Sequence, residues 1–331
     1  MKSYHLDQAG SLDGLVVREH DIPAPGPRHV LVRMRANALN ARDLGVLYGV
    51  RRIPPGNIPL TDGAGEVAAI GPGTTRFATG DRVITTFHPD WPGGPRPPVL
   101  QQDLNTVQGM LTEYAVVHEE ALVRMPDHLS FEEAATFTCA GLAAWNALVA
   151  TGPLLPGDAV LTQGTGGVSV FALQFAKCFG TRVIATSSAD DKLARLQSLG
   201  ADGLVNYRAQ PDWEIPVKQL AGGHGVDVAV EVACDMARTL KCVRNGARIS
   251  VLSRLASSAP DISFVTLIGR HITVYGVGTG SRNDMEAMLR AAALHRLKPV
   301  VDRVFPFADA REAYRHLERR AHFGKVVIRH D

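Results

Sequence analysis

Hydrophobic and polar positions change their spacing along the chain, and this change separates two kinds of sequence. From residue 1 to about 125, short apolar runs alternate with turns rich in proline and glycine. This pattern is typical of a β-rich domain with a small barrel-like core. The predicted strands cover residues 15–17, 30–36, 64–70, 83–86 and 113–117.

A different rhythm begins after Pro126. Ser130 is placed to cap a long helix over residues 134–148, and short apolar strands then alternate with helical segments. This alternation predicts a doubly wound parallel sheet, and hence an α/β fold for the second part of the chain. We expect strands at 159–162, 182–187, 203–206, 226–232, 248–253 and 272–277, with helices at 190–199, 213–220, 236–243 and 264–268. A helix at 283–297, a strand at 300–305, a helix at 309–317 and a strand at 325–329 complete the chain.

A glycine-rich turn joins the strand at 159–162 to the helix that Gly180 ends. Gly164 permits a tight turn, Gly166 lets the backbone approach a pyrophosphate, and Ser169 is small where helix and strand pack closely. The helix start presents free N–H groups to phosphate. An ordinary βα turn can share this spacing, but the strand before it and the helix after it favour dinucleotide binding. The predicted cofactor-binding residues of this turn are Gly164, Thr165, Gly166, Gly167 and Val168.

Composition narrows the class of protein further. The chain has 331 residues, of which 45% are hydrophobic and 21% charged, and its net charge is +2. These values predict a globular protein that binds neither nucleic acid nor membranes. The four cysteines show no CxxC spacing and the N-terminus has no apolar signal region, so we expect a cytoplasmic protein without disulfides.

A set of separate motifs, in order, resembles the medium-chain dehydrogenase/reductase superfamily. The motifs are LNARD at 39–43, DGAGEV at 62–67, GDRV at 80–83, CAGL at 139–142, the turn at 164–169, GVD at 225–227 and GKVV at 324–327. The resemblance implies a GroES-like, β-rich catalytic domain at 1–125 and 280–331. It also implies a Rossmann dinucleotide-binding domain at 126–279 and an active site in the cleft between them.

The superfamily contains zinc enzymes and zinc-free reductases, which differ in three ligand positions. A catalytic zinc needs three protein ligands. At two positions where zinc enzymes carry ligands, this chain has Asn40 and Thr61, and only Cys139 matches the third. The loop at 88–109 has no cysteine for a structural zinc, and Asp62, His88 and Asp90 match no standard metal spacing. We therefore expect no metal.

Without a Lewis acid, a quinone or activated enone is an easier hydride acceptor than a simple ketone. The resemblance to quinone oxidoreductases implies that Asn40 lies beside the nicotinamide, although it could instead hydrogen-bond a strand end. Asp43 is interpreted as a cap for a helix beginning at Leu44. Arg42 replaces the small hydroxyl residue of the zinc enzymes, so Tyr48 is the nearest candidate proton donor, with a packing role as the alternative.

The cofactor expected from the strand end at 182–187 is NADPH. NAD enzymes carry a carboxylate there for the ribose diol, whereas this chain has Ser187, which is assigned to the phosphate. The resembling NADPH-dependent reductases have a Lys and a Tyr at the positions of Lys192 and Tyr207. Ser188 is assigned to a capping box, and Asp190 and Asp191 would oppose a phosphate if they faced one.

Other segments are assigned by the same resemblance. It places the backbone of Leu252, Ser253, Val277 and Gly278 beside the nicotinamide. It also implies that Lys325 approaches the cofactor, although a lysine at the start of a strand can also be solvated. The apolar strand at 271–277 predicts a homodimer paired through a sheet edge. Alternatives to quinone or enone reduction of a small-molecule substrate are alcohol oxidation and a non-catalytic, NADPH-binding role.

Overall fold

The computed structural model describes residues 1–98, 108–233, 235–252 and 262–331. The chain forms two compact units, Met1–Leu142 with Gly280–Asp331, and Ala143–Thr279. The chain therefore enters and leaves the second unit once, as expected for an inserted domain. Residues 126–142, which the sequence assigned to the Rossmann part, group with the first unit.

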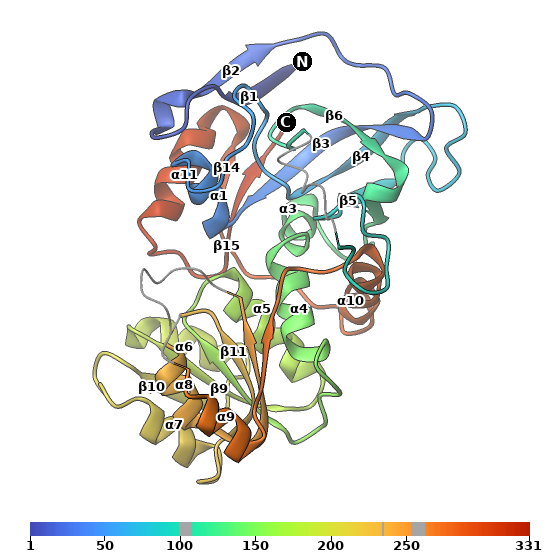
Figure 1. Ribbon diagram of the computed structural model, residues 1–331. Coiled ribbons are helices and arrows are strands. Elements are labelled where there is room, and N and C mark those ends of the chain that lie inside the picture. The colour runs from blue at the N-terminus through green and yellow to red at the C-terminus, as the bar shows by residue number, and fades with distance from the viewer. Residues whose placement is uncertain (99–107, 234, 253–261) are drawn as a thin grey trace. The chain divides into compact units, whose positions relative to one another are not determined.

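The first unit is built on a seven-stranded sheet. Its strands follow the order β14-β15-β3-β4-β5-β7, with β6 paired to β3, while β1 and β2 form a separate hairpin. In Figure 1, β14 and β15 carry the red end of the chain beside the blue β3. The strands are β1 (Lys2–Leu6), β2 (Leu15–Glu19), β3 (His29–Leu39), β4 (Gly63–Ile70), β5 (Arg82–Thr85), β6 (Tyr114–His118), β7 (Leu122–Arg124), β14 (Val301–Pro306) and β15 (Lys325–Arg329).

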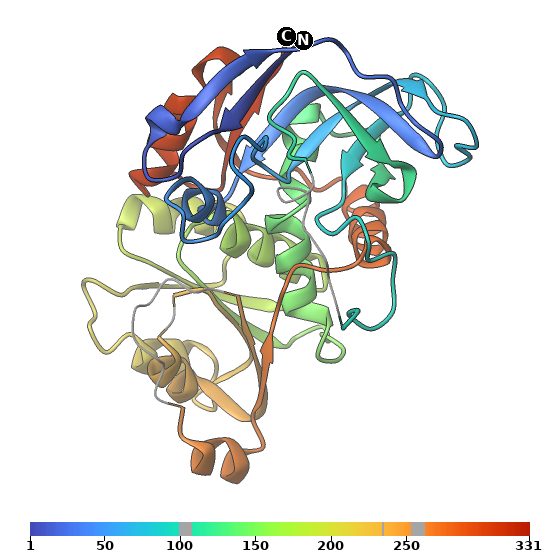
Figure 2. The same ribbon diagram turned by 45° about the horizontal axis from the view of Figure 1, so that its top comes forward.

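Helices cover parts of this sheet. They are α1 (Ala41–Leu47), α3 (Phe131–Ala134), α10 (Arg282–Leu294) and α11 (Ala310–Glu318), and α4 (Ala140–Val149) leads from the first unit into the second. In both ribbon views α1 lies beside α11 (Figures 1 and 2). Leu47 of α1 and Leu317 of α11 belong to one buried cluster that also contains Tyr4, Leu39 and Val326. This cluster fixes the end of β3, where the first candidate site lies.

The single long helix predicted over 134–148 was wrong. Residues 135–137 form a 3-10 turn between α3 and α4. The Thr136 hydroxyl donates to the carbonyl of Glu133 at 2.6 Å, and the Thr138 hydroxyl donates to the carbonyl of Thr85 at 2.8 Å. Threonine side chains that bond to the backbone compete with helical hydrogen bonds. The predicted Ser130 cap is confirmed, because its side chain accepts from the Glu133 N–H.

The second unit holds six parallel strands in the order β10-β9-β8-β11-β12-β13. This order reverses direction at β8 and β11, and ligands bind α/β sheets at such a switch point. Its strands are β8 (Ala159–Gln163), β9 (Arg182–Ser187), β10 (Gly203–Asn206), β11 (Val226–Glu231), β12 (Val243–Val251) and β13 (Thr273–Gly276). Its helices are α5 (Gly167–Cys178), α6 (Asp190–Ser198), α7 (Glu214–Leu220), α8 (Met236–Cys242) and α9 (Phe264–Arg270).

Candidate functional site

Asn40 stands where β3 ends and α1 begins. It is the N-cap of α1, and its backbone N–H donates to Oδ2 of Asp43 at 2.7 Å. The helix therefore begins three residues earlier than the predicted start at Leu44, because Asp43 satisfies a free N–H from inside the first turn. The prediction that Asp43 caps a helix beginning at Leu44 was wrong: Asn40 is the N-cap, and Asp43 lies inside the first turn as the second member of the capping box.

Lys325 reaches the side chain of Asn40 from the neighbouring strand. Strand β15 runs antiparallel to β3 with Val326 opposite Leu39, which places Lys325 beside Asn40. Its Nζ donates to Oδ1 of Asn40 at 2.6 Å and to the carbonyl of Leu39 at 2.7 Å. The side chain is only 3% exposed. The possibility of a solvated lysine is therefore wrong, and in the described structure the ammonium is turned into the first unit.

Asp62 completes this cluster from the third strand. It directly precedes β4, and β4 pairs with β3 on the side opposite β15. Its Oδ2 accepts from Nδ2 of Asn40 at 3.0 Å and lies 3.7 Å from Nζ of Lys325. Its Oδ1 accepts from the Thr61 hydroxyl at 2.8 Å. We call Asn40, Asp43, Asp62 and Lys325 the polar cluster; the amide of Asn40 is engaged in it at both ends.

The backbone at Leu60, directly before Thr61 and Asp62, is strained. Leu60 is a fully buried non-glycine residue with φ at 76°. Such a left-handed conformation costs of order 1–3 kcal/mol and persists only where the surroundings enforce it. Here the Thr85 hydroxyl donates to the Thr61 carbonyl at 2.8 Å, which helps to hold the segment in place.

The electrostatics of the polar cluster follow from burial. Burial raises the pKa of Asp43 to about 6, although Arg42 beside it acts in the opposite direction. Burial also raises the pKa of Asp62, and the charge of Lys325 opposes that rise. The same burial, together with the negative charge of Asp62, raises the pKa of the Cys139 thiol to about 12.

These groups do not fit a catalytic zinc. Zinc binds thiolates, neutral imidazoles and carboxylates, whereas the three ligand positions offer an amide, a hydroxyl and only one thiol. The Lys325 ammonium adds a positive charge next to the remaining carboxylate. Over the residues that the structure describes, no group of three His, Cys, Asp or Glu side chains could hold a metal ion.

Tyr48 lies away from the polar cluster. It caps the C-terminal end of α1, whereas Asn40 caps the N-terminal end, so their backbones are about 12 Å apart along the helix. Its hydroxyl donates to Oε1 of Glu318 at 2.6 Å. That hydrogen bond raises the pKa of Tyr48, which makes the phenol a weaker acid. The structure does not bring the two predicted catalytic residues together.

The glycine turn of the second unit fits a pyrophosphate. Gly164 has φ at 76°, and Gly166 is the N-cap of α5. A side chain added at either glycine would meet no protein atom within 4 Å, so both backbones border open space. The Ser169 hydroxyl donates to the Gln163 carbonyl at 2.6 Å and ties the helix to the strand end. Thr165 lies in this turn, and Gly167 and Val168 are the first two residues of α5.

The neighbouring strand ends hold the groups expected to select the cofactor. Ser187 ends β9 opposite Asn206 of β10, and the Tyr207 N–H donates to the Ser187 carbonyl at 3.0 Å. Tyr207 is 40% exposed, whereas the Ser187 side chain is buried. The capping box assigned to Ser188 was wrong, because α6 begins one residue later, behind Ala189. Asp190 instead accepts from Nδ2 of Asn206 at 2.6 Å.

The remaining predicted cofactor contacts lie at the ends of β12 and β13. The Leu252 N–H donates to the Glu231 carbonyl at 3.0 Å, and the Val277 N–H donates to the Val251 carbonyl at 2.9 Å. Gly278 follows in the loop after β13, and Ser253 lies outside the described residues. Of the long loop at 88–109, residues 99–107 are also outside them.

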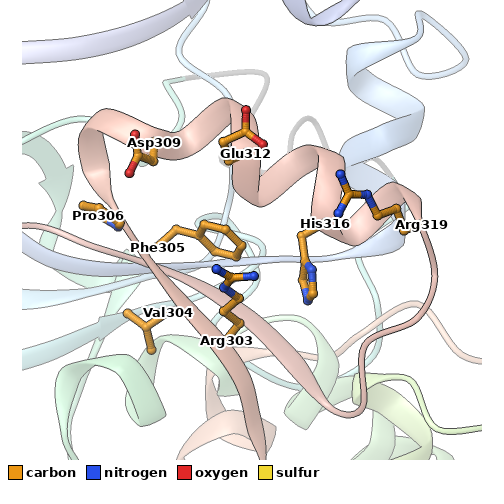
Figure 3. A pocket seen from close by; sticks show the side chains of 8 residues that line it. All are labelled: Arg303, Val304, Phe305, Pro306, Asp309, Glu312, His316 and Arg319. Carbon is orange, nitrogen blue, oxygen red and sulfur yellow. The ribbon is translucent and has the colours of Figure 1, made fainter.

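A surface hollow of about 250 Å³ lies between β14 and α11, and Figure 3 shows the side chains around it. Arg303 stacks over the ring of Phe305 with its Cζ 4.9 Å from the ring centroid, and acidic Asp309 and Glu312 face the same hollow. None of the predicted site residues lines it. Both basic and acidic side chains line the hollow, and the proposed reaction below does not use it.

Comparisons with known proteins agree with this architecture. The family "Alcohol dehydrogenase GroES-like domain" matches residues 26–127, and "Zinc-binding dehydrogenase" matches residues 167–293. A zinc-type alcohol dehydrogenase-like protein of Schizosaccharomyces pombe is 36% identical, over 98% of each chain. The chain belongs to the medium-chain dehydrogenase/reductase superfamily.

Solved structures of superfamily members carry two kinds of name. A structure named NAD-dependent alcohol dehydrogenase is 37% identical, with a TM-score of 0.91 over 99% of each chain. A quinone oxidoreductase of Pseudomonas syringae pv. Tomato is 26% identical, with a TM-score of 0.82 over 99% of each chain. The predicted combination of a GroES-like domain with a Rossmann-like parallel sheet is thus confirmed. The superfamily assignment makes the protein an oxidoreductase that uses a nicotinamide cofactor.

Two relationships of this superfamily member could not be found by motif. Asp62 was considered as part of a family motif and of an unusual metal site, and Glu318 was not singled out at all. Their partners lie far away in sequence, and the helical spacing around Glu318 resembles that of any solvent-facing helix position. Among the described residues, no helix combines the length and apolar character needed to cross a membrane.

Proposed function

We propose that the protein is a zinc-independent, NADPH-dependent oxidoreductase that transfers hydride to a quinone or an α,β-unsaturated carbonyl. The observation that carries this proposal is the polar cluster, in which Asn40, at a position where the resembling zinc enzymes carry a metal ligand, is bonded to the Lys325 ammonium. Reduced nicotinamide supplies the hydride when bound. Quinones and enones accept hydride without a Lewis acid, because the developing negative charge is delocalised within the acceptor.

The cofactor assignment rests on the glycine turn and on the ends of the neighbouring strands β9 and β10. The turn after β8 would hold the pyrophosphate at the start of α5, where N–H groups are free. Lys192 and Tyr207 would meet the 2′-phosphate. Of the two carboxylates that begin α6, Asp190 and Asp191, that of Asp190 is bonded to Asn206. This arrangement favours NADPH, although one similar structure bears the name of an NAD-dependent enzyme.

Other expected features belong to the same proposal. Asn40 is the group assigned to the nicotinamide, and Tyr48, bonded to Glu318, remains a predicted proton donor to the reduced oxygen. The backbone from Leu252 and Val277 onward would flank the nicotinamide. The active protein would be a homodimer paired through β13, which stands at the end of its sheet.

Alcohol oxidation is the competing activity, because several related proteins are named alcohol dehydrogenases. A screen that pairs each cofactor with each substrate class separates the possibilities. We expect NADPH oxidation with 1,2-naphthoquinone or an alkenal, and no reduction of NADP⁺ or NAD⁺ by primary alcohols. Turnover of alcohols with NAD⁺ alone would contradict the proposal, and no turnover with any pair would favour a non-catalytic role.

A further inference from the structure

The polar cluster contains one buried cation that the proposed reaction has not yet used. Lys325 is 3% exposed, and its Nζ contacts Oδ1 of Asn40, the carbonyl of Leu39 and the carboxylate of Asp62. A buried lysine costs free energy unless it is paired and hydrogen-bonded. Leu39 ends the neighbouring strand β3, Asn40 follows it, and Asp62 directly precedes β4, the next strand of the sheet.

These contacts decide how the amide of Asn40 is oriented. An amide oxygen accepts and an amide nitrogen donates. Lys325 can only donate, so it binds the oxygen, and the Asp62 carboxylate accepts from the nitrogen at 3.0 Å. An amide turned by half a rotation would face the ammonium with its NH₂ group and the carboxylate with its oxygen. Both contacts would then be repulsive, so the pair of charges locks one orientation.

We infer that Lys325 is a positioning residue that acts through Asn40, and that Lys325 and Asp62 together hold the Asn40 amide in one orientation. In this arrangement the amide of Asn40 contacts the nicotinamide region, and the buried ion pair fixes the orientation of that amide. The inference rests on the proposed function, because it takes Asn40 to be the group beside the cofactor. It assigns Lys325 a role inside the first unit, distinct from the direct cofactor contact expected from sequence.

Variants of the Lys325–Asp62 ion pair can separate an effect on the orientation of Asn40 from an effect on the stability of the fold. Removing one member of a buried pair leaves an uncompensated charge, whereas replacing both members with neutral side chains is often nearly neutral for stability. Lys325→Met should therefore lower the midpoint of chemical unfolding. The double variant Lys325→Met/Asp62→Asn should recover most of that loss, and Lys298→Met, at an exposed pair with Glu133, serves as the control. These unfolding measurements need neither cofactor nor substrate.

Activity then tests the role itself. We expect the double variant to bind NADPH with a dissociation constant within about twofold of the parent, but to lose about tenfold to 100-fold in kcat, as small displacements of reacting groups do. In an Asn40→Ala background, the same double change should cause little further loss, because the residue that it positions is already gone. Parent-like kcat in the stable double variant would overturn the inference. So would an equal loss in the Asn40→Ala background, since Lys325 would then act by another route.

The proposed function can fail separately. If the parent protein reduces no quinone or enone with NADPH, that proposal is wrong whatever the variants do. If the parent is active and only the Asn40 coupling is missing, the proposal stands and the positioning role of Lys325 is rejected.

Discussion

Nζ of Lys325 lies 2.6 Å from Oδ1 of Asn40, although 285 positions separate the two residues in the sequence. The contact exists because β15 pairs with β3 so that Val326 faces Leu39. The last strand of the chain thereby contributes a side chain to the first helix start of the catalytic unit. This return of the C-terminal tail gives the segment after Gly280 a direct part in the proposed active site.

Asp43 makes stability depend on pH. Its pKa rises from 3.8 to about 6 on folding, so the folded state binds the proton more tightly than the unfolded state. The contribution of Asp43 to the free energy of unfolding should therefore increase as pH falls from about 6 to about 4. Carboxyl groups with a lowered pKa, such as Glu119, contribute in the opposite direction. Asp43→Asn should remove the contribution of Asp43 and stabilise the protein at pH 7 by up to about 3 kcal/mol, because the amide oxygen can still accept from the Asn40 N–H.

Urea unfolding between pH 4 and pH 7 measures this effect. Asp21→Asn, at an exposed carboxyl, should leave the slope unchanged. If Asp43→Asn had the same pH slope as the parent, Asp43 would not carry the shifted pKa.

Gly166 offers a test of the pyrophosphate turn that spares the fold. Its φ is −73°, and an added Cβ would meet no protein atom within 4 Å. Gly166→Ala should therefore leave thermal stability nearly unchanged, yet weaken NADPH binding by about tenfold, which corresponds to about 1.4 kcal/mol of lost contact. Fluorescence titration measures the affinity.

Gly164→Ala provides the comparison. Because Gly164 has φ at 76°, alanine there is strained by about 1–2 kcal/mol and should lower stability as well as affinity. Unchanged NADPH affinity in Gly166→Ala would place the pyrophosphate elsewhere.

Lys192 should distinguish the two nicotinamide cofactors. A cation facing the 2′-phosphate forms charge-assisted hydrogen bonds, each worth about 1.5–3 kcal/mol. Lys192→Ala should therefore raise the dissociation constant for NADPH about tenfold and leave that for NADH nearly unchanged, as measured by calorimetry. Tyr207→Phe should cause a smaller loss, and Lys218→Ala on the exposed face of α7 should cause none. Equal binding of both cofactors by the parent would make Asp190 the ribose ligand instead.

Strand β13 should form the dimer contact. It is the last strand of its sheet, and Tyr275 on it is 42% exposed. Tyr275→Glu would place like charges opposite each other across a two-fold axis, so sedimentation should give the mass of one chain for this variant and of two chains for the parent. A monomeric parent at micromolar concentration would end the dimer proposal.

The sequence pattern predicted those elements whose conformation is determined by their own residues. Strand β15 has the predicted bounds, because its apolar residues are buried on both sides. The glycine turn was also predicted from the sequence, because the positive φ at Gly164 favours glycine. Strand β1 was missed because it is short, mixes polar with apolar residues, and is fixed by pairing with β2.

The polar cluster could not be predicted in the same way. Asn40, Asp62 and Lys325 each fit an ordinary role locally: an N-cap, a strand start and a solvated lysine. Only the register of three neighbouring strands brings them together. The hydrogen bond between Tyr48 and Glu318 has the same origin, since it depends on the packing of α1 against α11.

A metal-free reaction is tested by the rate of NADPH oxidation with 1,2-naphthoquinone before and after exhaustive chelation. We expect an unchanged rate after treatment with 1,10-phenanthroline, with zinc far below one ion per chain in both samples. Loss of the rate on chelation, with its return when zinc is added back and bound near Cys139, would contradict it.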